Sequence, residues 1–240
     1  MPHKTNPTFA GSIVLAISIC TLVAEPANGQ SQDKVVPVTA EANHRIRFDN
    51  GKVRMYEVEL QQGKATAFHE HVSDSFAVIL NTTSRANDPK DGQRSIAVVK
   101  AGQVGFASTA KGPYSHRIEA TAEVPYHVIA MELLSPGNLG TTNGAKKRFP
   151  PFDLAVQENP RGQAYRLILK PGESTGPFDR PANTAIFAIP GGRTSEVIDG
   201  KAPRLWDSNV GSFRWTDEPS RLTIRNEGTT EVDFIEIEVF

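Results

Sequence analysis

The chain has 240 residues, which is long enough for one large all-β domain or for two smaller ones with real cores. It carries 26 Lys and Arg residues against 27 Asp and Glu residues, and its only basic cluster is the Lys146-Lys147-Arg148 run. This balance argues against nucleic acid or an anionic membrane as a partner, so we expect the interior to carry the function, with a small molecule as its ligand.

Residues 1–29 have the pattern of a signal peptide. Lys4 precedes an uncharged apolar run from Ala10 to Ala24, and small residues at 27–29 offer a cleavage site. The run is short for a membrane span, so we expect cleavage and a periplasmic or secreted protein; an uncleaved anchor is the alternative. Cys20 is the only cysteine, so the mature chain would have neither a disulfide nor a sulfur ligand for a metal.

After a predicted linker at 30–43, the first strands surround a His-x-His pair. A strand is predicted near Arg54 to Leu60, and a turn at Gly63 follows it. His69 and His71 lie on the next predicted strand. Side chains at i and i+2 lie on one face of a strand, so the two imidazoles point the same way. Two adjacent imidazoles can bind one metal ion.

The next predicted strand runs from Asp74 to Leu80. Its larger apolar residues share a face with Asp74, which predicts a carboxylate in the interior and Phe76 on the wall of a pocket. Asp74 would then be a fourth metal ligand or a general base. The alternative is that Asp74 accepts hydrogen bonds from the amides of a turn.

Between this strand and the end of the first repeat, the sequence predicts one loop and one further ligand. Residues 81–92 are rich in Asn, Asp, Thr and Gly, which favours a solvated hairpin connection, with a pocket lid as the alternative. His116 begins a strand that would direct His116 and Ile118 inward, and Met131 on the last strand is a further candidate for the pocket wall.

The second half of the chain repeats the first. The segment 54–63 aligns with 163–172, and the segment 116–132 aligns without gaps with 222–238. Each repeat is a series of short strands separated by turn residues, a composition typical of jelly rolls. We therefore predict two barrels, at 44–134 and 151–240, joined by a linker at 135–150 that is rich in Gly, Asn and Pro.

The first repeat resembles the two sequence motifs of the cupin superfamily. Gly63 lies six residues before His69-Glu70-His71, an acidic residue follows at Asp74, and His116 comes later. Two features depart from the family pattern. The first motif usually has glutamate where this chain has Asp74 or Ser75, and the second usually has Pro-x-Gly before its histidine and asparagine four residues after it, where this chain has residues 111–113 and Ala120.

The resemblance implies an all-β chain of two tandem cupin-type jelly-roll barrels. It also implies one divalent transition metal in the first barrel, held by His69, His71, His116 and Asp74. Such a ligand set would suit Fe, Mn, Ni, Cu or Zn and does not choose among them.

The second repeat lacks these ligands. The residues aligned with the three histidines are Phe178, Arg180 and Leu222, and Asn183 aligns with Asp74. We therefore expect a structural or interface barrel at 151–240, through which a homo-oligomer would form. Binding of an anionic ligand by Asp179 or Arg180 is the alternative.

These patterns favour an exported, metal-dependent enzyme, an oxidoreductase of the dioxygenase type that acts on a small organic molecule such as an organic acid or a phenolic compound. Its reaction class rests on the family resemblance, whereas the metal site rests on the residues. Two alternatives stay open: a periplasmic protein that binds a metal or a small molecule without catalysis, and a structural bicupin with a vestigial site.

Overall fold

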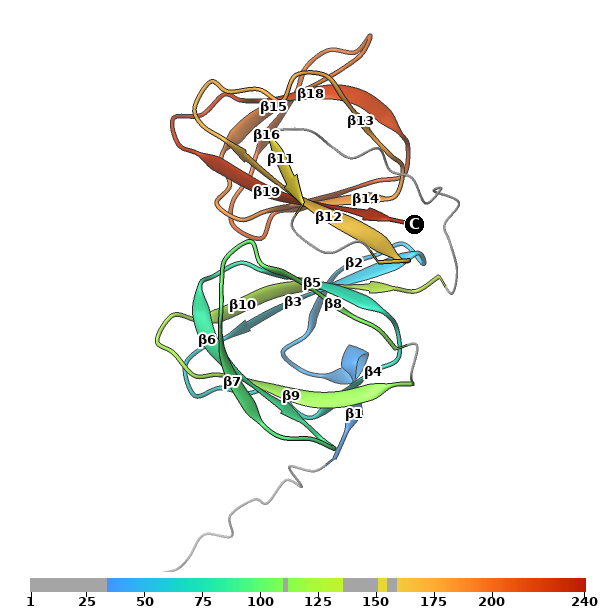
Figure 1. Cartoon of the computed structure of the whole chain (residues 1–240), viewed down its shortest axis with the longest axis vertical. Coiled ribbons are helices and arrows are strands. Elements are labelled where there is room, and N and C mark those ends of the chain that lie inside the picture. Colours follow the sequence, from blue (N-terminus) through green and yellow to red (C-terminus); the bar gives the residue numbers. More distant parts are fainter. Residues whose placement is uncertain (1–33, 110–111, 136–150, 155–158) are drawn as a thin grey trace, which may run out of the picture. The chain divides into compact units, whose positions relative to one another are not determined.

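The computed structural model describes residues 34–109, 112–135, 151–154 and 159–240. The predicted signal peptide and nearly all of the predicted linker at 135–150 lie outside these ranges. Within them, regular structure consists of β-strands and one short 3-10 helix, which confirms the all-β fold class (Figure 1). No helix of the described residues is long and apolar enough to span a membrane.

Two antiparallel five-stranded sheets, with one parallel strand pair, form the first barrel. One has the order β1-β4-β9-β6-β7 and the other the order β2-β3-β10-β5-β8. The elements are β1 (Val36–Pro37), η1 (Val38–Ala40), β2 (Arg45–Asp49), β3 (Val53–Leu60), β4 (His69–His71), β5 (Ser75–Ile79), β6 (Thr83–Pro89), β7 (Ser95–Val99), β8 (Val104–Ala107), β9 (Tyr114–Ala120) and β10 (Tyr126–Leu133).

The second barrel has a five-stranded and a four-stranded sheet. Their orders are β11-β12-β19-β14-β17 and β13-β18-β15-β16. The strands are β11 (Phe152–Leu154), β12 (Gly162–Leu169), β13 (Phe178–Arg180), β14 (Thr184–Ala188), β15 (Arg193–Ile198), β16 (Arg204–Asp207), β17 (Phe213–Thr216), β18 (Ser220–Asn226) and β19 (Val232–Val239).

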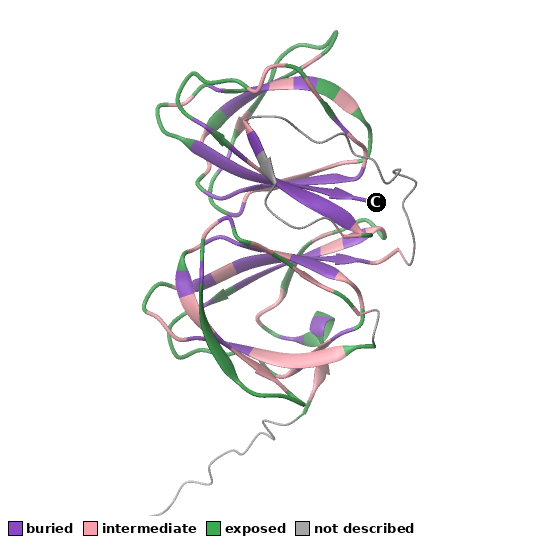
Figure 2. Ribbon diagram, viewed as in Figure 1, coloured by how far each residue is buried: buried purple, intermediate pink, exposed green. Residues whose placement is uncertain are grey.

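The buried apolar residues form three clusters. One fills the first barrel, from Leu60 on β3 to Ile118 on β9, and another fills the second barrel. The third contains residues of both barrels, including Phe76 on β5 and Phe187 on β14. Strands β10 and β19 are therefore covered on both faces, and β19 is buried along its whole length (Figure 2). Such strands have apolar residues in both phases, which the alternation rule alone does not anticipate.

The strand register supports the internal repeat. His69 pairs with His116 between β4 and β9, and Phe178 pairs with Leu222 between β13 and β18, as the alignment of the two halves requires. Gly63, which precedes the histidine pair, has a φ of 74°, and its counterpart Gly172 has a φ of 77°. A left-handed backbone of this kind is easily adopted only by glycine, so both repeats use the same turn.

Two segments differ from the sequence predictions. Residues 81–92 were expected to form a loop, but most of them form β6, which pairs with both β7 and β9. The predicted linker at 30–43 contributes β1, whose Val36 pairs with His69, and the buried Glu41. Polar residues dominate both segments, and only their pairing partners reveal the strands.

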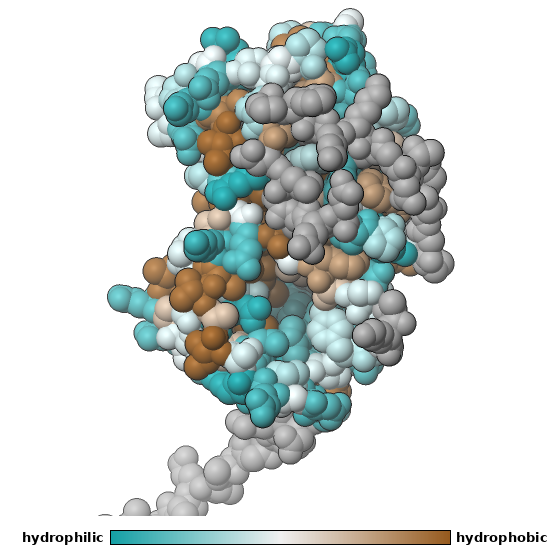
Figure 3. Space-filling view, viewed as in Figure 1, coloured by the Kyte–Doolittle hydropathy of each residue, from teal (hydrophilic) through white to brown (hydrophobic). Residues whose placement is uncertain are grey.

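The molecular surface is mixed in polarity. Figure 3 shows one face, on which apolar residues gather in several patches between polar ones. The most exposed large apolar side chains include Val72 at 62%, Ile96 at 65% and Val98 at 69%. Small groups of exposed apolar residues are normal for a folded protein and do not by themselves mark a binding surface.

Candidate metal centre

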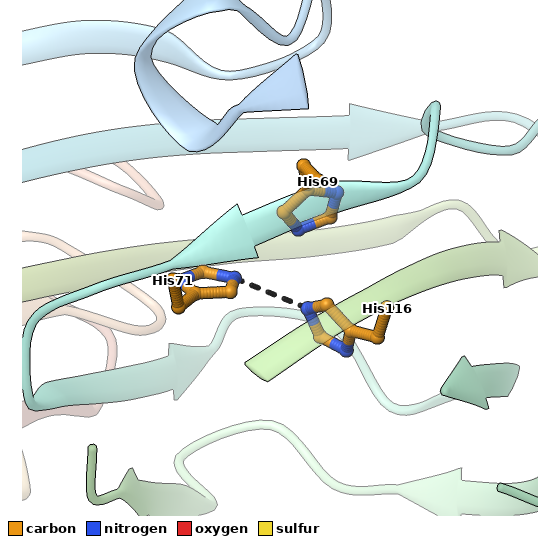
Figure 4. Close-up of side chains that lie close together, drawn as sticks. All are labelled: His69, His71 and His116. Atoms are coloured by element: carbon orange, nitrogen blue, oxygen red, sulfur yellow. Dashed lines mark hydrogen bonds between the residues drawn. The ribbon is translucent and has the colours of Figure 1, made fainter. Parts of the chain in front are cut away.

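Three histidines from two neighbouring strands converge inside the first barrel. His69 and His71 lie on β4, and His116 faces them from β9 (Figure 4). His69 and His71 are buried and Glu70 between them is half-buried, as expected for a strand whose i and i+2 residues share the inner face. The sequence placed His116 at the start of its strand, whereas β9 already begins at Tyr114.

The three rings are close enough to share one ion. One ligand nitrogen from each histidine can be chosen so that all lie within 4.8 Å of one another. The Nε2 atoms of His71 and His116 are 3.1 Å apart. Two nitrogens that each bind one ion at about 2.0–2.1 Å are at most about 4.2 Å apart. The His71 and His116 pair already meets this limit.

Hydrogen bonds fix the orientation of two of the rings. His69 Nδ1 donates to the Ala67 carbonyl at 2.9 Å, and His116 Nδ1 donates to Asn87 Oδ1 at 2.7 Å. Each bond places the proton on Nδ1 and leaves the Nε2 lone pair available for a metal. His71 Nδ1 is buried and has no hydrogen-bond partner among the described residues. This ring is instead positioned by stacking on Tyr114, with ring centroids 4.8 Å apart.

The site keeps its histidines neutral. Burial, followed by the charges of neighbouring histidines, lowers the pKa of His69 to about 4 and that of His71 to about 3. Burial also lowers the pKa of His116, where His69, His71 and Arg85 disfavour a further positive charge. A metal binds the neutral imidazole, so protons do not compete strongly for these ligands at neutral pH.

Glu41, which the sequence patterns do not indicate, supports the site through hydrogen bonds to residues next to His69. Glu41 Oε1 accepts a hydrogen bond from the Ala67 amide at 3.0 Å, and Glu41 Oε2 accepts one from His44 Nδ1 at 2.6 Å. Burial alone would raise the pKa of Glu41, but these hydrogen bonds and one from Asn43 lower it to about 2. His44 in turn packs against His69, with ring centroids 4.5 Å apart.

The histidines open onto a cavity of about 200 Å³. Ile118 lines it, as the sequence predicted, and small residues such as Ala77 and Ala130 leave it open. Phe76 and Met131 were also expected there, but both pack in the cluster shared by the two barrels. The phase of β5 and β10 is the reason: Phe76 and Met131 share a face with the residues that pack on the second barrel, and the opposite face of each strand lines the cavity.

The structure places Asp74 away from the three histidines, and this corrects the prediction of a fourth ligand or general base. Asp74 Oδ1 accepts hydrogen bonds from the amide and the hydroxyl of Thr109, at 2.7 and 3.1 Å. Its other oxygen is 3.7 Å from Arg161 Nε. Asp74 shares its phase with Phe76, so it lies on the outer side of the sheet. The alternative role, in which Asp74 binds a loop amide, fits the structure.

His127 on β10 also lies away from the three histidines. Its Nε2 is 2.8 Å from Glu57 Oε1, on the side of β10 that carries Ile129 and Met131.

In the second barrel, the candidate residue Arg180 has a structural role. Arg180 is buried between Glu236 and Glu196, at 2.6 and 3.0 Å, so its guanidinium is already paired.

The donor set fits a divalent metal ion. Three neutral imidazoles converge, two are held in the tautomer that frees Nε2, and the cavity leaves space on one side for a further ligand. Imidazole nitrogens suit several divalent ions, so the set does not identify the metal. The three histidines are therefore a site that can hold one divalent metal.

Comparisons with solved structures support the fold. No protein-family model and no curated protein matches the sequence. AerE from Microcystis aeruginosa is similar over 79% of this chain and 88% of that one, with a TM-score of 0.59 and 13% identity. A mutant of Bacillus subtilis oxalate decarboxylase is similar over 78% and 68%, with a TM-score of 0.53 and 12% identity. Another structure of this decarboxylase, described for its Mn(II) centers, has a TM-score of 0.51 over the same shares at 13% identity.

Identities this low establish the fold and leave the activity open. The matches extend over both barrels, since they cover more than three quarters of the chain. Together with the paired sheets of each repeat, they confirm the prediction of tandem jelly-roll barrels. The chain therefore shares the two-barrel fold of these solved structures, which is the fold that the resemblance to the cupin motifs predicts.

Proposed function

We propose that the protein binds one divalent transition metal through His69, His71 and His116 and acts on a small organic molecule as a metal-dependent enzyme of the dioxygenase type. The observation that carries this proposal is the convergence of three neutral imidazoles at the wall of a cavity. The Mn(II) centers of the structurally similar decarboxylase are consistent with a metal in such a barrel.

The metal and the residues around the three histidines would have different roles. When bound, the metal would supply Lewis acidity and an open coordination position. Glu41 and Asn87 hold the ligand shell through Ala67, His44 and His116. Burial raises the pKa of Tyr114 to about 12 despite a hydrogen bond with Ser75, so its hydroxyl stays protonated and can donate to a bound molecule.

The nitrogen-only donor set bears on the choice of metal. Imidazole suits Fe, Ni, Cu and Zn, whereas Mn prefers sites with more oxygen ligands. With Asp74 directed elsewhere, no carboxylate belongs to the cluster of described ligand residues. We therefore favour Fe, Ni or Cu over Mn for a dioxygenase-type reaction, whereas Zn, which has no redox chemistry, fits only a binding role.

A binding protein without catalysis is the second candidate function. Among the described residues that line the cavity there is no Asp or Glu, so a carboxylate general base is not at hand. A protein that retains a ligand on its metal needs no such base. Oxygen consumption or conversion of a candidate compound by the metal-loaded protein separates catalysis from retention.

Metal analysis of the purified protein tests the site itself. We expect about one metal per chain after reconstitution with Fe, Ni, Cu or Zn, and less than about a tenth in a His69→Ala, His71→Ala double variant. His127→Ala is the matched control, because His127 pairs with Glu57 outside the cavity and its loss should leave the metal content unchanged. Equal metal content in the double variant and the unmodified protein would refute the site.

Export is a separate part of the proposal. It rests on the apolar run from Ala10 to Ala24, and residues 1–29 would be removed. Mass spectrometry of the protein recovered from a periplasmic or secreted fraction should give a mature chain that begins near residue 30. A full-length chain retained in the membrane fraction would favour the uncleaved anchor.

Assembly of a homo-oligomer through the second barrel is also a proposal, and light scattering of the mature protein would test it.

A further inference from the structure

The cavity beside the triad has an arginine on its wall that no internal carboxylate neutralises. Arg85 on β6 lines the cavity together with the three histidines. Its Nε is buried and has no hydrogen-bond partner, and no carboxylate of the described residues forms an ion pair with it. Arg85 as a whole is half-buried, so its guanidinium is partly removed from water, and this costs free energy unless something else binds to it.

Arg85 is an exception within its own barrel. The other arginines of the described first barrel form ion pairs with carboxylates, and these are Arg45 and Arg47 with Glu57, Arg54 with Asp49, Arg94 with Glu119, and Arg117 with Asp88. The sequence thus supplies a partner for each arginine on the outside of the barrel. The arginine at the cavity is left for a partner that comes from solution.

The position of Arg85 on its strand directs it toward the metal site. Asn87 lies two residues further along β6, on the same face, and its Oδ1 accepts the hydrogen bond from His116 Nδ1 at 2.7 Å. The positive charge of Arg85 acts on His116 and on Tyr126, both of which also line the cavity. A molecule in the cavity would therefore lie within reach of both the triad and the guanidinium.

The second barrel shows that the scaffold does not require this arginine. Arg85 pairs with Ala120 between β6 and β9, and the equivalent pair between β15 and β18 is Thr194 with Asn226. Thr194 is buried there, and its hydroxyl donates to the Trp206 carbonyl. A small neutral residue thus satisfies the same strand position in the second barrel.

We propose that Arg85 is the anion-binding residue of the cavity and that the ligand is a small carboxylate. This inference rests on the proposed function, because it places the carboxylate next to the metal site. A planar guanidinium binds a carboxylate through two parallel hydrogen bonds. The cavity of about 200 Å³ corresponds to about seven water molecules at about 30 Å³ each, so a small organic acid fits inside it.

Calorimetry on the Zn²⁺-loaded protein tests the inference with two isosteric pairs, acetate against acetamide and benzoate against benzamide. We expect the unmodified protein to prefer each carboxylate, and Arg85→Gln to bind the carboxylates at least about 10-fold more weakly with little change for the amides. Arg94→Gln is the matched control, since Arg94 pairs with Glu119 outside the cavity. No preference for carboxylates in the unmodified protein, or an unchanged preference in Arg85→Gln, would overturn the inference.

Two further measurements separate this inference from the proposed metal function. Zinc content and melting temperature are recorded for every variant, and Arg85→Lys, which keeps the charge, should retain part of the preference. The same probes are titrated into the metal-free protein, and the carboxylates should raise its melting temperature more than the amides do. In the metal-free Arg85→Gln variant this difference should disappear. If the protein binds no metal, the metal function fails, and this metal-free comparison still decides the role of Arg85.

Discussion

The two barrels use the same interior positions in opposite ways. In the first barrel His71 faces a cavity, and Ala130 on β10 is small enough to leave it open. At the corresponding positions of the second barrel, Arg180 and Glu236 form a buried ion pair at 2.6 Å. The second interior is closed by charges that satisfy one another, whereas the first holds polar groups that are satisfied only in part.

The difference extends to the supporting residues. Asn87, which orients His116, corresponds to Glu196, which binds both Arg180 and Arg214 at 3.0 and 2.9 Å. A neutral amide suits a metal ligand, while a carboxylate suits a guanidinium. This comparison indicates that one scaffold tolerates either a hollow site or a filled network, so the histidines are present for a ligand rather than for packing.

The largest expected effect is acid destabilisation of the metal-free first barrel. The pKa values of His69 and His71, at about 4 and 3, lie below the ordinary value of 6.5, and the pKa of His116 is lowered as well. The unfolded chain therefore binds more protons, and stability present above pH 6.5 is lost as the pH falls toward the folded pKa values. Denaturant unfolding should show a loss of about 2 kcal/mol per histidine between pH 7 and pH 5.

A variant that copies the second barrel sharpens this prediction. The double substitution His69→Phe, His116→Leu introduces the residues found at Phe178 and Leu222 and removes two of the three titrating groups. Its stability should fall about one third as much over the same pH range. If the pH dependence were the same in both proteins, the histidines would not be its source.

The second barrel should be more sensitive to loss of a single charge. Replacing Arg180 by Met leaves Glu236 and Glu196 buried without that partner, and we expect a loss of about 3–5 kcal/mol in the free energy of unfolding. Arg221→Met is the control, because its ion pair with Asp179 is about half exposed on both sides and should contribute less than about 1 kcal/mol. Similar losses in the two variants would argue against a filled ionic interior.

Asn87 offers a smaller test of the first barrel. Asn87→Leu removes the oxygen that accepts the proton of His116 Nδ1, so the ring loses its fixed orientation. Chelator competition should show metal binding about 10–100-fold weaker. Asn81→Leu carries the same change at a residue whose amide donates to the Pro125 carbonyl, and its metal affinity should be unchanged. Equal affinities in the two variants would remove Asn87 from the ligand shell.

The sequence predicts the fold and the three histidines because both depend on local patterns. Alternation along β3, the left-handed turn at Gly63, and the i, i+2 spacing of His69 and His71 can be recognised from neighbouring residues. The repeat adds an internal alignment, which predicts Phe178 and Leu222 as counterparts of His69 and His116, in agreement with the strand register.

The remaining features depend on contacts between distant segments. Glu41 reaches the Ala67 amide from outside the predicted barrel, and Arg85 and Asn87 lie in a segment whose composition favours a loop. The face of β5 was assigned wrongly because its larger apolar residues pack on the second barrel. When both faces of a strand are buried, alternation no longer tells which one lines the cavity.

Asp74 is where the smallest effect is expected and where sequence and structure differ most. Asp74→Asn keeps the shape of the side chain, so metal affinity should change less than about 2-fold, while the weaker hydrogen bonds from Thr109 should reduce the free energy of unfolding by about 1 kcal/mol. Measured beside Asn87→Leu, this variant compares a carboxylate outside the cavity with an amide at its edge. A loss of metal affinity of more than about 10-fold would mean that Asp74 does bind the metal. The start of β5 would then have to rotate toward the cavity when the ion binds.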